Sequence, residues 1–118
     1  MNNAHSSFVG TDGTWVEVLK PPQQSSLARP ALFLDRDGTI VEEVLYLHRP
    51  EEMALIPGAA DTIIAANTKN IPVIIVTNQA GIGRGYYGWD DFIAVQACMM
   101  EELHDLGAQI NAVFACPF

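Results

Sequence analysis

The chain has 118 residues, of which 49% are hydrophobic, and its formal net charge is −8 at pH 7. This length suits one domain, and the apolar fraction suffices for a folded core. The negative charge disfavours nucleic acid and anionic membrane surfaces as partners. Two cysteines make no disulfide framework, no apolar run reaches transmembrane length, and the first 30 residues lack the features of a signal peptide. We therefore expect a cytoplasmic protein, and a monomer.

Residues 1–30 differ in character from the rest and are expected to form an arm and a linker. Turn-forming residues are frequent in them, and residues 21–26 (Pro-Pro-Gln-Gln-Ser-Ser) are typical of a linker. Residues 14–19 alternate as a short strand does. Its Trp15 docks on the body of the protein or on a partner; the alternative is that it belongs to a loosely held tail.

The first candidate site lies in residues 31–40. The apolar residues 31–34 precede Asp35, Asp37 and Gly38. Such a run is typical of a buried parallel strand, whose carboxyl end delivers functional groups. Asp35 is then a candidate nucleophile beside a bound cation, and Asp37 a candidate proton donor to a leaving group. A β-hairpin that turns at residues 37–38 is the alternative interpretation.

The elements that follow predict an α/β fold. Residues 40–52 have no clean period, which indicates an extended flap; its His48 and Arg49 either meet an anionic substrate or lie on the surface. Helices are predicted over residues 59–69 and 89–106, and strands over residues 71–76 and 110–115. The apolar face of the second helix comprises Phe92, Val95, Met99, Leu103 and Leu106. Strands that alternate with helices favour a Rossmann-like parallel sheet with flanking helices.

The second candidate site follows the strand over residues 71–76. Thr77 and Asn78 offer a hydroxyl and an amide to phosphate oxygens, and Arg84 adds a positive charge. The glycines of residues 81–85 could leave backbone N–H groups open to an anion, although their spacing matches neither a dinucleotide fingerprint nor a P-loop. A plain glycine-rich connection is the alternative. Parallel strand ends share one sheet edge, where open α/β sheets bind ligands.

The two motifs together resemble the haloacid dehalogenase (HAD) superfamily of phosphatases. Residues 34–39 (Leu-Asp-Arg-Asp-Gly-Thr) resemble its first signature, and residues 76–79 (Val-Thr-Asn-Gln) resemble its second. The longer match is to the branch that holds heptose bisphosphate phosphatases and histidinol-phosphate phosphatases. The resemblance covers about residues 31–118, which are therefore expected to be the N-terminal part of a HAD-like phosphatase domain.

The resemblance implies a role for each matching residue. Asp35 would be the nucleophile, forming an aspartyl-phosphate, and also a Mg²⁺ ligand. Asp37 would be the general acid/base and a second Mg²⁺ ligand through its backbone carbonyl. Thr77 and Asn78 would hold the phosphoryl group of a small phosphorylated metabolite, and Arg84 would face it. The implied reaction is hydrolysis of a sugar-phosphate monoester, most like a heptose bisphosphate, with histidinol phosphate as the alternative substrate.

The chain also departs from the family pattern. The third-motif lysine or arginine and the fourth-motif acid would follow the last predicted strand, so a fold that is incomplete at its C-terminal side is expected. The branch carries a zinc loop that begins Cys-Pro-His, whereas this chain has Cys116, Pro117 and Phe118. Since a structural zinc needs four ligands, Cys116 could bind Zn²⁺ only in a longer form. The expectation is a truncated phosphatase, and a non-catalytic remnant that binds a phosphorylated ligand or a partner chain is the alternative.

Overall fold

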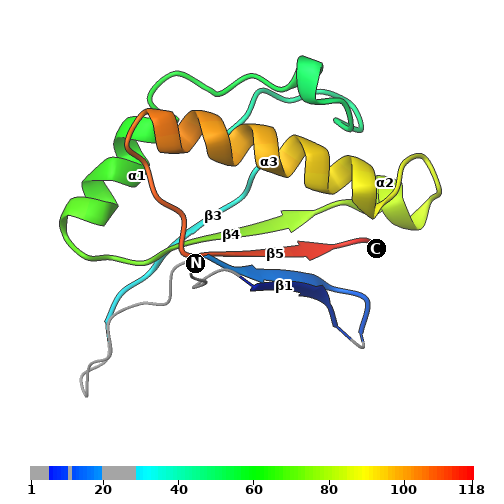
Figure 1. Ribbon diagram of the computed structural model, residues 1–118, viewed down its shortest axis with the longest axis horizontal. Coiled ribbons are helices and arrows are strands. Elements are labelled where there is room, and N and C mark those ends of the chain that lie inside the picture. Colours follow the sequence, from blue (N-terminus) through cyan, green and yellow to red (C-terminus); the bar gives the residue numbers. More distant parts are fainter. Residues whose placement is uncertain (1–5, 11, 20–28) are drawn as a thin grey trace.

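The computed structural model of the chain describes residues 6–10, 12–19 and 29–118, so the linker expected over residues 21–26 lies outside the described residues. The strands are β1 (Ser6–Val9), β2 (Trp15–Val18), β3 (Leu32–Leu34), β4 (Val73–Asn78) and β5 (Ala112–Cys116). The helices are the 3₁₀ helix η1 (Pro50–Glu52), α1 (Ala59–Thr68), α2 (Ala80–Gly83) and α3 (Trp89–Asp105). Figure 1 shows how they are arranged.

One sheet contains all five strands, in the order β1-β2-β5-β4-β3. Its second half is parallel: β4 pairs with β3 on one side and with β5 on the other. This confirms the predicted α/β fold, with α1 in the connection from β3 to β4 and α3 in the connection from β4 to β5. The hairpin alternative at residues 37–38 is wrong, because β3 pairs with a parallel strand and the N–H groups of residues 39–41 all turn back to the carbonyl of Arg36.

The sheet is mixed because a hairpin extends it. Strand β1 pairs antiparallel with β2, and β2 pairs antiparallel with β5, with Trp15 opposite Ala115. Trp15 is buried and meets the ring of Phe92 edge-on, with 5.1 Å between ring centroids. The prediction that Trp15 docks on the body is thus confirmed. The sequence did not predict β1.

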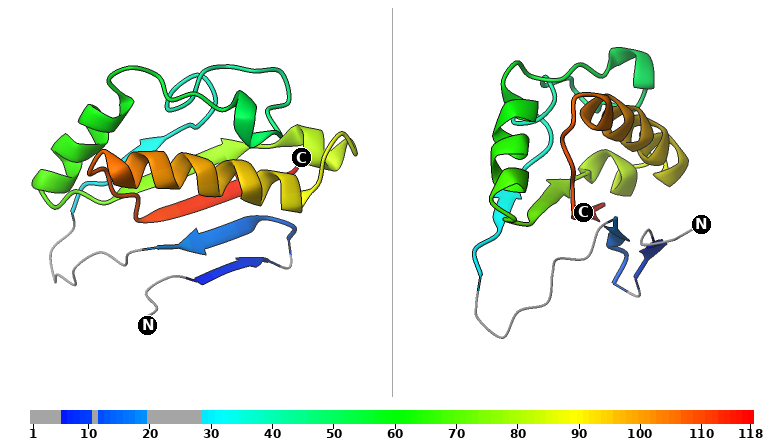
Figure 2. Two further views of the ribbon diagram at one scale, coloured as in Figure 1. Left: turned by 45° about the horizontal axis from the view of Figure 1, so that its top comes forward. Right: turned by 60° about the vertical axis from the view of Figure 1, so that its left-hand side comes forward.

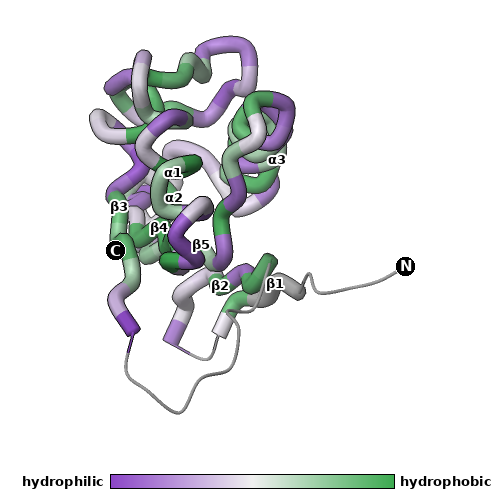
Figure 3. The backbone as a smooth tube through the Cα atoms, turned by 90° about the vertical axis from the view of Figure 1, so that its left-hand side faces the viewer, coloured by the Kyte–Doolittle hydropathy of each residue, from purple (hydrophilic) through white to green (hydrophobic). Residues whose placement is uncertain are grey.

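The helices cover one face of the sheet, as Figures 1 and 2 show from three directions. Alternate strand residues point to them and are fully buried, as the period of a strand requires; they include Val73, Ile75, Thr77, Val113 and Ala115. In the part of the chain that the structure describes, no helix covers the other face. There Phe33, Val76 and Phe114 are 64%, 50% and 37% exposed. The tube in Figure 3 has hydrophobic colouring along β3 and β4.

Helix α3 supplies much of the core. Of the apolar face predicted for it, four residues are buried, namely Phe92, Val95, Met99 and Leu103. Leu106 was predicted to join them but is 58% exposed, because the helix ends at Asp105 and the chain turns away through Gly107 at φ 89°. Within the described residues, every helix is too short or too polar to cross a membrane.

Candidate active site

The two motifs meet at one edge of the sheet. Asp35 directly follows β3, and Thr77 and Asn78 end the neighbouring strand β4. A side-chain hydrogen bond joins the motifs, since Gln79 Nε2 donates to Asp37 Oδ2 at 3.1 Å. The structure therefore brings together the strand ends that the sequence pattern placed at a common edge.

The first motif is a tight turn that leaves Asp35 accessible. Gly38 has φ 83°, a conformation that favours glycine, and its N–H donates to the carbonyl of Val41 at 2.8 Å. Asp35 Oδ1 accepts the backbone N–H of Arg36 at 2.9 Å, which fixes the carboxylate. The Asp35 side chain is exposed, so an incoming ligand could reach its other oxygen.

Arg36 holds Asp37 from inside the protein. Its guanidinium is buried and donates from Nε to Asp37 Oδ2 at 3.1 Å and from Nη2 to Oδ1 at 3.0 Å. The cation also lies over the ring of Phe92, with 5.5 Å from Cζ to the ring centroid. Two-point contacts of this kind fix the plane of a carboxylate. Asp37 is therefore held in one orientation beside the exposed Asp35.

Gln79 is a site residue that the sequence analysis missed. Its side chain is buried, and Nε2 donates both to Asp37 Oδ2 and to Thr77 Oγ1, the latter at 2.9 Å. Its Oε1 accepts the hydroxyl of Tyr87 at 2.5 Å. Burial raises the pKa of Tyr87, so this hydroxyl stays protonated and remains a donor at neutral pH. The sequence feature that could have identified Gln79 is its amide directly after Thr77 and Asn78 at the end of a strand, with a tyrosine eight residues further on.

The other predicted residues of the second motif have local partners. Asn78 Oδ1 accepts the N–H of Ala80 at 3.0 Å, and its Nδ2 donates to the carbonyl of Phe118 at 2.9 Å. Arg84 is exposed, and its Nη1 donates to the hydroxyl of Tyr46 at 2.8 Å. The glycine-rich segment forms the short helix α2. The N–H groups of Gly83 and Gly85 are bonded to carbonyls. The expectation that they are open to an anion is therefore wrong for these two glycines.

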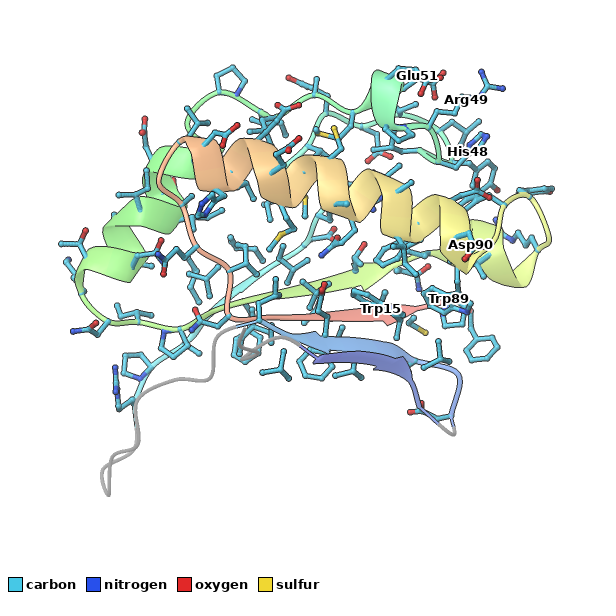
Figure 4. All side chains as sticks on the ribbon, in the orientation of Figure 1. Trp15, His48, Arg49, Glu51, Trp89 and Asp90 are labelled. Carbon is cyan, nitrogen blue, oxygen red and sulfur yellow. The ribbon has the colours of Figure 1, made fainter. Side chains whose placement is uncertain are left out.

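The flap closes over this edge and forms a pocket of roughly 200 Å³. Residues 43–47 line it from the flap, and Asp37, Asn78 and Gln79 line it from the motifs. His48 is half-buried and stacks on Tyr87, with 5.5 Å between ring centroids. Arg49 is exposed and lies 4.0 Å from Glu52, away from the pocket lining (Figure 4). The predicted flap thus lines the pocket with residues 43–47, while His48 packs on Tyr87 behind the lining and Arg49 lies on the surface.

Gly81 allows the flap and the second motif to approach each other. A Cβ atom at this position would lie 2.3 Å from Tyr87 Cε1 and 2.9 Å from Tyr46 Cδ1. Gly81→Ala is therefore expected to displace both rings and lower the free energy of unfolding by about 1–3 kcal/mol. Gly88→Ala is the matched control, since a Cβ there meets nothing within 4 Å and φ is −115°. Urea unfolding of both variants measures the difference, and equal stability would contradict this packing.

The donors at this edge fit a magnesium ion. Mg²⁺ binds one or two carboxylates, keeps several waters and takes further oxygens from a substrate phosphate. The exposed carboxylate of Asp35 and the backbone carbonyl of Asp37 are donors of that kind. In residues 6–10, 12–19 and 29–118 no group of three or more His, Cys, Asp or Glu side chains could hold a metal. Cys116 is a free thiol, and the four ligands of a structural zinc are not assembled around it by the described residues.

Comparison with known proteins supports the resemblance to HAD-superfamily phosphatases. No family model matches the chain. A D-glycero-beta-D-manno-heptose-1,7-bisphosphate 7-phosphatase from Mesorhizobium japonicum is 43% identical over 110 residues, which are 90% of this chain and 48% of the relative. The same enzyme from Rhodopseudomonas palustris is 41% identical over 93 residues, 79% of this chain and 52% of the relative. The chain thus spans about half the length of these curated relatives.

Solved structures show the same likeness. A HAD-like phosphatase from Mesorhizobium loti superposes with a TM-score of 0.80 at 42% identity, over 89% of this chain and 50% of the other. A D,D-heptose 1,7-bisphosphate phosphatase from B. bronchiseptica, complexed with magnesium and phosphate, superposes with a TM-score of 0.71 at 28% identity, over 75% and 50%. The chain is therefore similar to HAD-like phosphatases over about half of their length. More narrowly, its homologues are named D-glycero-D-manno-heptose-1,7-bisphosphate 7-phosphatases.

Proposed function

We propose that the chain hydrolyses a sugar-phosphate monoester with Mg²⁺ through an aspartyl-phosphate on Asp35, and that the substrate is D-glycero-D-manno-heptose 1,7-bisphosphate, cleaved at its 7-phosphate. The observation that carries this proposal is the pairing of an exposed carboxylate, Asp35, with a second carboxylate, Asp37, that Gln79 ties to the second motif. The names of the homologues support the substrate, and the magnesium and phosphate in the B. bronchiseptica structure support the cofactor.

In the first step, a carboxylate oxygen of Asp35 attacks phosphorus. An Asp35–phosphorus bond forms while the bond from phosphorus to the sugar oxygen breaks. The leaving oxygen takes the proton of Asp37, so the sugar departs with a hydroxyl group at the position of the broken ester. Proton donation of this kind contributes about 10²–10⁴-fold to such reactions, provided that the acid is positioned at the leaving atom.

In the second step, water attacks phosphorus and Asp37, now a carboxylate, accepts its proton. The bond between Asp35 and phosphorus breaks, inorganic phosphate leaves, and both side chains return to their starting states. The net reaction consumes one water and yields one alcohol and one phosphate. Positioning and charge neutralisation account for most catalysis in phosphoryl transfer.

The remaining residues bind and position the substrate. Thr77 and Asn78, at the end of β4, would hold the phosphoryl oxygens, and Arg84, which reaches the flap at Tyr46, would face the rest of the substrate. Asn78 would exchange its present contacts with Ala80 and Phe118 for a phosphoryl oxygen. A bound Mg²⁺ would neutralise charge on the phosphoryl group.

The direct test is phosphate release by the 118-residue chain with Mg²⁺ and with EDTA. Heptose 1,7-bisphosphate and histidinol phosphate are offered separately at equal concentration. We expect release that requires Mg²⁺ and has the higher kcat/KM with the heptose bisphosphate. Preference for histidinol phosphate would overturn the substrate assignment. No release from either, together with binding of inorganic phosphate, would favour the alternative of a phosphate-binding remnant.

A further inference from the structure

The buried amide of Gln79 contacts three side chains from different parts of the candidate site. Gln79 Nε2 lies 3.1 Å from Asp37 Oδ2 and 2.9 Å from Thr77 Oγ1, and Gln79 Oε1 lies 2.5 Å from the hydroxyl of Tyr87. Gln79 is 3% exposed. The amide is thus inside the protein, where a donor or acceptor left without a partner is costly.

The direction of the amide is set by the carboxylate of Asp37, which can only accept. The two amide hydrogens therefore face Asp37 and Thr77, and the amide oxygen faces Tyr87, whose hydroxyl donates to it. If the amide were reversed, its oxygen would face the carboxylate of Asp37 and the hydroxyl of Thr77. Burial raises the pKa of Tyr87 and so keeps its hydroxyl protonated, while its ring is fixed by the stacked ring of His48.

Gln79 constrains each of its two acceptors, Asp37 and Thr77, in a different way. Gln79 holds Asp37 at Oδ2 from the side of β4, in addition to the two contacts from Arg36, one to each carboxylate oxygen. Thr77 Oγ1 accepts a hydrogen from Gln79, so its own hydroxyl hydrogen is available for a different oxygen. One side chain therefore sets both the place of the proton carrier and the direction of a phosphate donor.

We propose that Gln79 is a positioning residue that holds Asp37 at the leaving oxygen of the ester, and that Tyr87 anchors the Gln79 amide by donating to its oxygen. This inference rests on the proposed function, because it requires Asp37 to be the proton donor. Gln79 itself touches neither phosphorus nor the leaving group. It acts through Asp37.

The leaving group distinguishes positioning from a merely structural role. A sugar alkoxide needs a proton to depart, whereas nitrophenolate is a much weaker base and departs without one. A misplaced Asp37 should therefore slow the first step for the sugar ester and spare the first step for p-nitrophenyl phosphate, whereas the second step, in which Asp37 accepts the proton of water, is common to both. General damage to the pocket or loss of phosphate binding would slow both esters together.

The experiment compares Gln79→Met with wild type on heptose 1,7-bisphosphate and on p-nitrophenyl phosphate, in the 118-residue chain with Mg²⁺. The rate of leaving-group release is measured in a single turnover, with the chain in excess over substrate, so that only the first step is compared. We expect release of the sugar to slow by about 10- to 100-fold, because part of the full contribution of an acid is lost. For release of nitrophenolate we expect a change of less than about threefold, since little proton transfer is needed. Equal losses on both esters, or no loss on either, would overturn the role given to Gln79.

The matched control is Gln96→Met on α3. Gln96 is also 3% exposed, and neither of its side-chain polar atoms has a hydrogen-bond partner within the described residues. The same chemical change there should leave both hydrolysis rates within about twofold of wild type, as is typical of a substitution that breaks no hydrogen bond. A selective loss of sugar-ester hydrolysis in this control would show that the readout is not specific to Gln79.

Tyr87→Phe is the second variant, and it decides the question if Gln79→Met does not fold. It keeps the ring that stacks on His48 but removes the hydrogen bond to Gln79 Oε1. We expect a selective loss of about 3- to 10-fold on the sugar ester, smaller because the amide is freed and not removed. No selective loss would overturn the inference. A wild-type chain that cleaves neither ester would overturn the proposed function itself, which is a distinct result.

Discussion

Asp35→Asn is expected to abolish phosphate release, with a fall in kcat of at least about a thousandfold, as removal of a covalent nucleophile generally causes. The side chain is exposed at the carboxyl end of β3, and its Oδ1 is already fixed by the N–H of Arg36. An asparagine keeps that shape and hydrogen bond. Its neutral amide, however, is a poor nucleophile and does not hold a divalent cation.

The control for this prediction is Asp61→Asn. Asp61 is also an exposed aspartate, but it lies in the first turn of α1 and belongs to neither motif. The control variant should retain turnover within about twofold, because a surface substitution away from the site leaves the site unchanged. The assay is phosphate release at saturating substrate with Mg²⁺, and the fold of both variants is checked by circular dichroism. Turnover that survives in Asp35→Asn would contradict the nucleophile assignment.

Phe92→Ala is expected to cause the largest loss of stability, about 3–5 kcal/mol in the free energy of unfolding. The ring is 1% exposed and has edge-on contacts with Trp15 at 5.1 Å and Trp89 at 5.6 Å between centroids. It also lies under the guanidinium of Arg36. The substitution opens a cavity where the hairpin, helix α3 and the first motif meet. This loss is a large share of the stability of a typical domain, about 5–15 kcal/mol.

The neighbouring residue supplies the control. Ile93 is on the same turn of α3 but is 44% exposed, so Ile93→Ala should cost no more than about 1 kcal/mol. Urea unfolding followed by tryptophan fluorescence measures both variants, and Trp15 and Trp89 report on the contacts in question. If Phe92→Ala unfolded at the same urea concentration as Ile93→Ala, the three-way contact around Phe92 would not stabilise the protein.

The parallel half of the fold could be predicted because each element has a strong local pattern. The β-branched run of residues 71–76 predicted the strand that the structure places at Val73–Asn78 as β4, and the apolar period of α3 is buried as expected, apart from Leu106. Strand β1 could not be predicted, since residues 6–9 have no clear period and form a strand by pairing with β2. Tertiary pairing, not local preference, decides such segments.

The meeting of the two motifs could also be predicted from the sequence. Because parallel strands end at a common edge, placing Asp35 beside Thr77 required only the strand assignments. The contacts of Gln79 were not predicted from the sequence, since they include a hydrogen bond from Tyr87 across the turn of α2. The glycines around Gly83 were expected to bind an anion, but their N–H groups close α2 and its contact with Pro117. The division of the chain at residue 30 and the roles of Asp35, Asp37, Thr77, Asn78 and Arg84 stay predictions.

The proposed mechanism is tested most directly by acid quench of the chain during turnover of heptose 1,7-bisphosphate with Mg²⁺, followed by peptide mass spectrometry. The mechanism predicts that the peptide containing Asp35 gains the mass of one phosphoryl group, that the modification maps to Asp35, and that it disappears when substrate is exhausted. Steady phosphate release with no modified Asp35 peptide, or a phosphoryl group on another residue, would contradict it.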